Sequence, residues 1–302
     1  MRRFLFLLCV LAACSPKRIA LNGVADALSS NGDGGAFARD DDPELVAAAV
    51  PFALKTMESL SDSLDDHVGL RLAMARGFTQ YAYAFVQQPA VEGTDAERVK
   101  RDTVRARRLY LRARAYGLEG LKLARGVTEA QLRGPEAERT RALGSLQKED
   151  VPLLYWTLVP WAAAIATSKG NLASDLVGDI SLVGALLDRA LQLDEAFDGG
   201  ALHEFAVTFN GARPEGAKRE DLKAHFERAR ALGKGTRISA LVSYAENVLT
   251  QPPQDKQQFE ALLNEAKSFD VDLPAARNNR LANVLAQRHA IWLLAHEEDT
   301  FP

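Results

Sequence analysis

Side chains that could perform catalysis or hold a metal ion are few, and none stands in a complete catalytic motif. The stretch HEFAV, residues 203–207, begins like the zinc helix of a metalloprotease, but Val207 occupies the position of the second histidine. The stretch GARPEGAK, residues 211–218, has two glycines at P-loop spacing, but Ala217 occupies the lysine position. No CxxC, GxSxG or GxGxxG motif occurs. The sequence therefore predicts a protein that is not an enzyme and has neither a metal site nor a cofactor.

Cys14 is the one side chain whose surroundings predict a covalent modification. Arg2 and Arg3 precede the apolar run FLFLLCVLAA, which is too short for a usual membrane-spanning helix. The run leads into LAAC, ending at Cys14, and this resembles the lipobox of a bacterial lipoprotein, in which cleavage precedes the cysteine and acyl chains are added to it. An ordinary signal peptide with an incidental cysteine is the alternative. We expect lipidation at Cys14 and anchoring at the periplasmic face of a bacterial membrane.

The expected domain organisation follows from this cleavage site. Residues 1–13 are predicted to be the lipoprotein signal peptide and residues 14–38 a lipidated tether. Residues 39–302 are predicted to form an all-α domain. Ser15, rather than aspartate, follows the cysteine, and this favours the outer membrane over the inner one.

Aromatic residues are concentrated in the stretch GFTQYAYAFVQQ, residues 77–88. On a helix, Phe78 and Phe85 fall on one apolar stripe with Tyr81, whereas Tyr83 lies on the neighbouring side. The phenylalanines are expected to pack in the core. For the two tyrosines, core packing and a ligand wall both remain open, because tyrosine offers apolar area together with a hydroxyl group.

Two further stretches contribute to the same hypothesis. YWTLVPWAAAI, residues 155–165, adds two tryptophans, and the last helical stretch adds a row of amide side chains. Ligand sites are mostly apolar with a few placed polar groups, so we hypothesise an aromatic-lined cavity on the concave side of the helices. Its candidate residues are Gln80, Tyr81, Tyr83, Trp156, Trp161 and Asn283.

A basic stripe runs along the predicted helix 96–125. Its arginines are spaced at four, three and four residues and therefore share one helix face; they are Arg101, Arg105, Arg108 and Arg112. A solvated helix face is the simpler interpretation. The functional one is a surface that attracts an acidic partner protein. The formal net charge of −3 argues against a nucleic-acid partner.

The elements that must position these residues are all predicted to be helices. Alanine, leucine, arginine and glutamate dominate the composition, and these are good helix formers. No strand pattern competes with the helical periodicity. The predicted helices span 43–61, 66–87, 96–125, 128–146, 151–168, 174–193, 199–209, 218–232, 236–249, 255–268 and 276–297.

Several of these helices end in related stretches, such as LRARAYG, DRALQLD, ERARALG and NEAKSFD. Their aligned alanines, Ala113, Ala190, Ala229 and Ala266, are separated by 77, 39 and 37 residues. A period near 38 is close to that of tetratricopeptide-type helix pairs. We therefore expect degenerate tetratricopeptide-like helical hairpins, stacked into an arc with a concave face, plus additional N-terminal helices.

Long stretches of the mature chain resemble one known family in the same order. They include ARDDDPELVAAAVPFALKTMESL, GFTQYAYAFVQ, YWTLVPWAAAI, ALLDRALQLDEAFDGGALHEF and NNRLANVLAQRHAIWLLAHEEDTF. Together they look like the T component (TatT family) of tripartite ATP-independent periplasmic (TRAP) transporter systems. The resemblance implies a non-catalytic lipoprotein that forms a homotrimer and partners a periplasmic solute-binding P component. It also implies that the protein handles small ligands, including hydrophobic ones.

Two other functions compete with a transport subunit. One is a helical-repeat lipoprotein that acts as a scaffold for envelope assembly and carries no small ligand. The other, from a different class, is a periplasmic hydrolase that uses scattered acidic and histidine residues. A ligand-sized aromatic site would favour the transport subunit over the scaffold.

Overall fold

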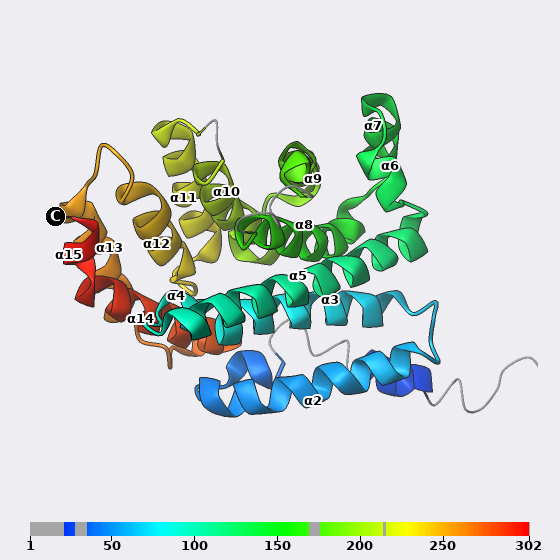
Figure 1. Cartoon of the computed structure of the whole chain (residues 1–302), viewed down its shortest axis with the longest axis horizontal. Coiled ribbons are helices and arrows are strands. Elements are labelled where there is room, and N and C mark those ends of the chain that lie inside the picture. Colours follow the sequence, from blue (N-terminus) through cyan, green and yellow to red (C-terminus); the bar gives the residue numbers. More distant parts are fainter. Residues whose placement is uncertain (1–20, 28–34, 169–175, 214–215, 302) are drawn as a thin grey trace, which may run out of the picture.

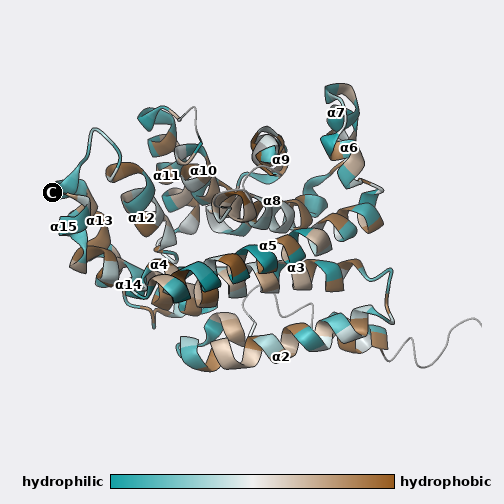
Figure 2. Cartoon of the chain, in the orientation of Figure 1, coloured by the Kyte–Doolittle hydropathy of each residue, from teal (hydrophilic) through white to brown (hydrophobic). Residues whose placement is uncertain are grey.

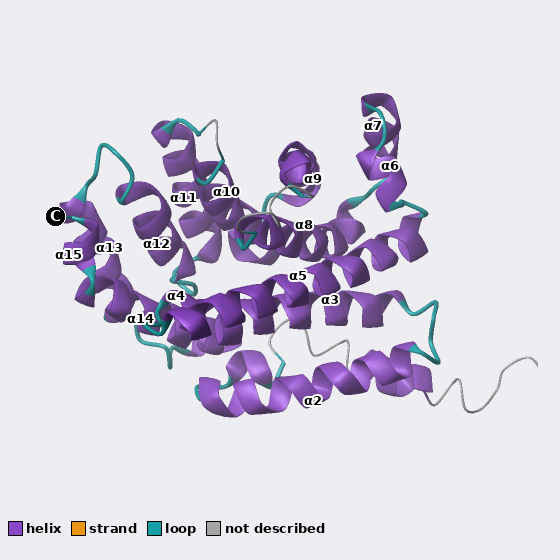
Figure 3. Cartoon of the chain, viewed as in Figure 1, coloured by secondary structure: helices purple, strands orange, loops and turns teal. Residues whose placement is uncertain are grey.

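The computed structural model describes residues 21–27, 35–168, 176–213 and 216–301. Every regular element in these ranges is a helix (Figure 3), so the all-α prediction is confirmed for them. Cys14, the predicted signal peptide and much of the predicted tether lie outside the described residues. No helix in the described ranges is both long enough and apolar enough to cross a bilayer.

The N-terminal part is built from three long helices, α2 (Pro43–Ser61), α3 (Val68–Ala82) and α5 (Ala96–Arg125). The start of α2 is fixed by Asp42, which accepts a hydrogen bond from the Leu45 amide. Asp95 caps α5 in the same way, and Gly126, with φ of 69°, ends it. Because these caps are local in sequence, the predicted bounds of α2 and α5 agree with the structure.

The next elements stack on this layer. In Figure 1, α3 lies beside α5, and α8 (Val151–Ala166) covers the other side of α5. A Cβ atom added to Gly117 of α5 would lie 3.0 Å from the Cα atom of Thr157. Glycine is therefore required where these two helices cross. Helix α9 (Ile180–Asp194) packs on α8 in turn.

The C-terminal part consists of shorter helices that pack mainly on their neighbours in the chain. They are α10 (Ala201–Gly211), α11 (Arg219–Gly233), α12 (Ser239–Tyr244), α13 (Lys256–Lys267), α14 (Arg280–Ala295) and α15 (Glu297–Thr300). Helix α14 also contacts α2 and the short helix η1 (Phe37–Arg39) near the start of the domain. Arg280 pairs with Asp41 at 2.6 Å, and Arg288 pairs with Glu44. The last long helix is therefore joined to the first one.

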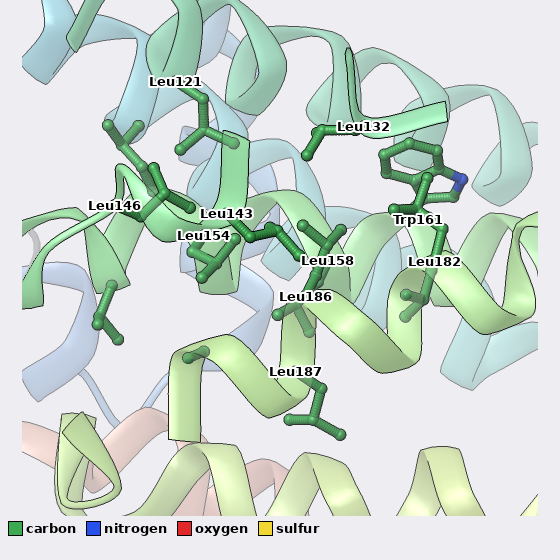
Figure 4. Packing of buried hydrophobic residues seen from close by; sticks show 14 of the residues in the cluster. Leu121, Leu132, Leu143, Leu146, Leu154, Leu158, Trp161, Leu182, Leu186 and Leu187 are labelled. Carbon is green, nitrogen blue, oxygen red and sulfur yellow. The ribbon is translucent and has the colours of Figure 1, made fainter. Parts of the chain in front are cut away.

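Most buried residues belong to two large cores. The first is centred on α8, which is apolar over most of its surface (Figure 2) and is packed by leucines of α5, α7 (Glu136–Gly144) and α9 (Figure 4). A helix that is apolar all round must be buried. The second core lies among α11, α12, α13 and α14 and includes the stacked rings of Phe226 and Tyr244. These cores hold the two parts of the chain rigid on either side of the site described below.

Several predicted helices differ from those observed. The predicted helix 236–249 is α12 followed by the π-helix η7 (Ala245–Leu249). The predicted helix 128–146 is broken at Gly134 and Pro135 into α6 (Glu129–Arg133) and α7, because proline lacks the amide donor. The predicted helix 66–87 ends in a π-helix, η2 (Tyr83–Gln87), followed by the short α4 (Gln88–Val91). The predicted helix 276–297 starts as a 3₁₀-helix, η8 (Pro274–Asn279). The tetratricopeptide-like register of the hairpins stays a prediction.

Candidate functional site

Two π-helical regions lie on either side of the buried His289 ring, which is 2.9 Å from Glu92, shortly after the first, and 3.2 Å from Glu246 in the second. The first, η2, begins at Tyr83; the second, η7 (Ala245–Leu249), contains Glu246. Although the two are far apart in the sequence, the charge of Glu246 contributes to raising the pKa of Tyr83. Single-turn π-helices are rare and are found frequently at functional sites. This region is therefore the place to look for a ligand site.

Tyr83 is exposed to solvent, and yet the pKa of its hydroxyl is raised as in a buried group. Its side chain is 52% exposed to solvent. Burial nevertheless raises the pKa of its hydroxyl, and the carboxylates of Glu246, Glu204 and Glu92 raise it further. Solvent thus reaches the ring while protein atoms surround it. From the two observations together we infer that Tyr83 lines a concave part of the molecule, which we call the recess.

Tyr155 of α8 shares the electrostatic environment of the recess. Its half-buried ring packs edge-on against Trp156, with centroids 4.9 Å apart, and against Phe197 at 5.3 Å. Burial raises the pKa of Tyr155, and the charges of Glu204 and Asp198 add to this rise. The charge of Glu204 thus contributes to raising the pKa of both Tyr83 and Tyr155.

Glu204 of α10 is the central carboxylate of the recess. It accepts hydrogen bonds from the hydroxyls of Ser239, at 2.8 Å, and Ser243, at 3.4 Å. Among the described residues, no cationic side chain lies within ion-pair distance of it. The nearby Arg237 pairs instead with Asp198, at 3.0 Å. Burial would lower the pKa of Arg237, but the negative charges of Asp198 and Glu204 have the larger effect, so the pKa is raised.

A buried histidine joins the two π-helical regions beside the recess. The His289 ring lies 2.9 Å from Glu92 through Nδ1 and 3.2 Å from Glu246 through Nε2. Burial would lower the pKa of His289, but the hydrogen bonds and charges of Glu246 and Glu92 raise it above the ordinary value. The two facing carboxylates favour the charged form of the ring, which links Glu92, just after α4, to Glu246 of η7.

The structure places the predicted cavity residues in different surroundings. Tyr83 lies in the recess, and Trp156 packs against Tyr155 at its edge. Trp161 is fully buried in the first core, where its Nε1 donates to Asp179 at 2.9 Å. The guanidinium groups of Arg114 and Arg133 also lie over the Trp161 ring.

Asn283, Gln80 and Tyr81 do not join Tyr83. Asn283 is buried, and its amide bonds to the backbone of Thr236 and Ile238. Gln80 is exposed. The half-buried Tyr81 ring packs between α3 and α5, with Arg105 donating to its hydroxyl at 3.3 Å. Tyr81, near the end of α3, and Tyr83, at the start of η2, therefore face different sides of the molecule.

All four arginines of the basic stripe are exposed along α5. Two of them also contact other helices. Arg105 lies over Tyr81, and Arg112 lies over Phe78 and pairs with Glu58. Arg101 pairs only with its neighbour Asp102. Arg108 has no hydrogen bond or ion pair within the described part of the chain, so Arg101 and Arg108 are the members available to a partner.

A second hollow, of about 430 Å³, lies between α10 and α11. His203 and His225 meet there, with their Nδ1 atoms 2.9 Å apart. Burial lowers the pKa of both rings, and for His203 the neighbouring His225 adds to this effect. Across the described residues, no group of three or more histidine, cysteine or carboxylate side chains is placed to hold a metal ion.

Sequence reasoning missed three residues of the recess, namely Tyr155, Glu204 and Glu246. Tyr155 stands beside Trp156 in a stretch that the sequence already singled out. Glu204 stands in HEFAV, where attention fell on the absent second histidine. A lone carboxylate among the apolar residues of α10 was the signal that could have identified it.

Comparisons with known proteins give one family match and one similar protein. A family model described as TRAP transporter T-component matches residues 39–301. A protein of Treponema pallidum (strain Nichols), described as an uncharacterized protein, is 31% identical over 316 residues. That alignment covers 99% of this chain and 96% of the relative.

Proposed function

The chain belongs to the TRAP transporter T-component family, and from this premise we propose that it is a non-catalytic accessory subunit that handles a small ligand in the recess. The ligand passes between this subunit and a periplasmic solute-binding P component of the same transport system. The alternative is a scaffold for envelope assembly that carries no small ligand.

The exposed ring of Tyr83 in the recess is the observation that carries the proposal. Soluble proteins seldom leave a large aromatic ring accessible inside the fold, because burying apolar area is favourable. A ring that stays accessible there is available to a ligand. Trp156, Tyr155 and Phe197 continue the aromatic surface, and Glu204 supplies a polar group, as in ordinary ligand sites. A scaffold would not need such a surface.

Three further features belong to the proposal. Lipidation at Cys14 holds the subunit at the periplasmic face of a membrane, and the outer membrane fits Ser15 better than the inner one. The subunit is a homotrimer, in line with the closed symmetry of most soluble oligomers. The exposed Arg101 and Arg108 attract an acidic surface of the P component.

Binding of a neutral apolar dye, N-phenyl-1-naphthylamine, tests the ligand site. In the Tyr83→Ala variant we expect affinity for the dye to fall about tenfold, because the aromatic contact and its buried area are lost. The melting temperature should change little, since the ring is half exposed. Phe52→Ala is the matched control, because Phe52 is 79% exposed on α2; it should leave binding and melting unchanged.

Two results would contradict the ligand site. If the wild-type chain does not bind the dye, the scaffold becomes the better proposal. If Tyr83→Ala melts as low as a core variant, for which truncating a buried aromatic costs about 3–5 kcal/mol, Tyr83 serves packing instead.

A further inference from the structure

Helix α2 has apolar side chains on its outer face that the fold leaves uncovered. Phe52 is 79% exposed and Leu45 is 59% exposed, and they are the two most exposed large apolar residues in the described part of the chain. They are seven positions apart, which is about two helical turns, so they lie on the same side of α2. The exposed Ala48 lies between them on that side. We call these three residues the outer patch.

The outer patch lies opposite the face by which α2 packs into the fold. Leu54, two positions after Phe52, is 3% exposed and packs with Leu70 and Met74 of α3. Two positions of a helix differ by about 200° around its axis, so the two faces point in nearly opposite directions. In Figure 1, α2 runs along the edge of the molecule, next to α3. The outer face of such a helix is normally polar, and apolar residues gathered there indicate an interaction surface.

The start of the chain limits how far this surface can be from a membrane. Cys14, the proposed lipidation site, and residue 21, where the described structure begins, are seven positions apart. Seven residues reach at most about 25 Å. Residues 21–27 are helical, and Ala25 packs in the same cluster as Leu54 of α2. Acyl chains at Cys14 therefore keep α2 close to the bilayer that holds them.

The charged residues of α2 are all paired within the chain. Glu44 pairs with Arg288, and Lys55 pairs with Glu58 at 2.6 Å. These pairs leave no net positive charge on α2 that would attract anionic headgroups. The outer patch can therefore contribute to membrane binding through apolar contact. An aromatic ring and an aliphatic side chain suit the boundary between headgroups and acyl chains.

We propose that the outer patch lies against the bilayer that anchors the chain, with Phe52 and Leu45 inserted at the boundary between headgroups and acyl chains. This inference rests on the proposed function, because it requires the lipid anchor at Cys14. The anchor alone is one flexible point of attachment. The outer patch adds a second contact, which turns α2 toward the membrane and the opposite side of the molecule in Figure 1, with α7 and α9, toward the periplasm.

Fluorescent labels at two positions of the lipidated full-length chain test this orientation. The sequence contains two cysteines, Cys9 and Cys14. The first is removed with the signal peptide and the second is acylated, so an introduced cysteine is the only reactive thiol. Ala48→Cys places a label in the outer patch and keeps its two large side chains. Ala137→Cys is the matched control, because Ala137 is an exposed alanine of α7, far from α2 in Figure 1.

Both labelled chains are reconstituted in phosphatidylcholine vesicles. We expect brominated phosphatidylcholine to quench the label at position 48 but not the label at position 137. Iodide in the buffer should quench the label at position 48 several-fold less than the other. Adding Phe52→Ser and Leu45→Ser to the Ala48→Cys chain should restore iodide quenching, because the apolar area is lost. The vesicles should still carry this variant through its acyl chains. Phosphatidylglycerol in the vesicles or added salt should change little.

Three results would overturn the inference, and they differ in what they leave standing. Equal quenching at both positions would mean that α2 does not touch the bilayer, while the anchor remains. Protection of position 48 from iodide without quenching by brominated lipid would mean that protein covers the outer patch, and sedimentation would show whether it is a second copy of this chain. Wild-type protein that does not sediment with the vesicles would contradict the anchor at Cys14 itself.

Discussion

The imidazole of His289 contacts Glu92, which lies 197 positions earlier in the sequence. It is 5% exposed and holds carboxylates on both ring nitrogens. One side chain thus fixes the distance between the two π-helical regions that carry Tyr83 and Glu246. Its protonation state should therefore affect the stability of the whole site.

Stability should depend on pH through His289 in a defined direction. Because its folded-state pKa is raised above the unfolded value, its contribution is fully present below the unfolded pKa. The contribution is lost as pH rises through the folded-state pKa. We expect His289→Gln to lower stability by about 1.5–3 kcal/mol at mildly acidic pH, the range of hydrogen bonds to charged groups. The deficit should shrink as pH rises.

Thermal melting of wild type and variant across this pH range measures the effect. His203 and His225 have lowered pKa values, so they contribute the opposite slope, and only the difference between wild type and variant isolates His289. His296→Gln changes an exposed histidine of the same region and is the control. A constant difference at all pH values would mean that His289 is not charged in the folded protein.

Residue-level prediction from sequence depends on local pattern. For Tyr83, helical periodicity left core packing and a ligand wall both open, because it placed this residue on the side next to the stripe of Phe78. Trp161 shows the limit of local pattern. Its burial is determined by Asp179 and Arg133, which contact it from other elements, and no local pattern reports such contacts.

At the scale of elements, the crossing of α5 and α8 decides how closely the central layers pack. Gly117 lies at this crossing, against the backbone of Thr157. Any side chain there pushes the two helices apart. Since α8 carries Tyr155 and α5 supports η2, the crossing also sets the position of the recess walls.

Replacing Gly117 measures how much the close approach of α5 and α8 contributes to stability. Gly117→Ala should destabilise the fold by about 1–3 kcal/mol, the usual cost of overpacking, although alanine favours helix formation. Gly144→Ala in α7 is the matched control, because nothing lies within 4 Å of its added Cβ atom; it should be neutral or slightly stabilising. Chemical denaturation of both variants provides the comparison. If Gly117→Ala and Gly144→Ala are equally stable, α5 and α8 can move apart without a loss of folding free energy.

The bounds of a helix could be predicted from the sequence where residues close to its ends determine them. Asp42 and Asp95 cap α2 and α5, and these helices were predicted with the observed bounds. The π-helices η2 and η7 were not, because their sequences read as ordinary helix, and packing against the rest of the fold selects the wider turn. The recess depends on both of them, so its geometry could not be obtained from sequence.

At the scale of the whole molecule, α5 presents Arg101 and Arg108 to solvent as part of an exposed basic stripe. Reversing both to glutamate should slow association with the P component several-fold at low salt and reduce its dependence on salt. Folding should be unaffected, because both side chains are exposed and neither forms an ion pair with another described helix. Association rates at several salt concentrations measure this, and sedimentation of the same samples reports whether the subunit is a trimer.

A control pair keeps the change in net charge constant. Arg141→Glu together with Lys267→Glu alters exposed positions on α7 and α13 and should slow association less. If both double variants behave alike, the effect reflects overall charge and the stripe is a solvated helix face. If neither changes the rate, steering by α5 is excluded.

The contact of α14 with α2 and η1 changes how the helical array must lose its structure. An open array of helical repeats has neighbour contacts only, so its end units can fray independently of the rest. Here the ion pairs of Arg280 with Asp41 and Arg288 with Glu44 connect the two ends. Opening either end therefore also breaks contacts with the other end, and we expect the two ends to unfold together. These contacts join residues far apart in the sequence, and such contacts are slow to form in folding.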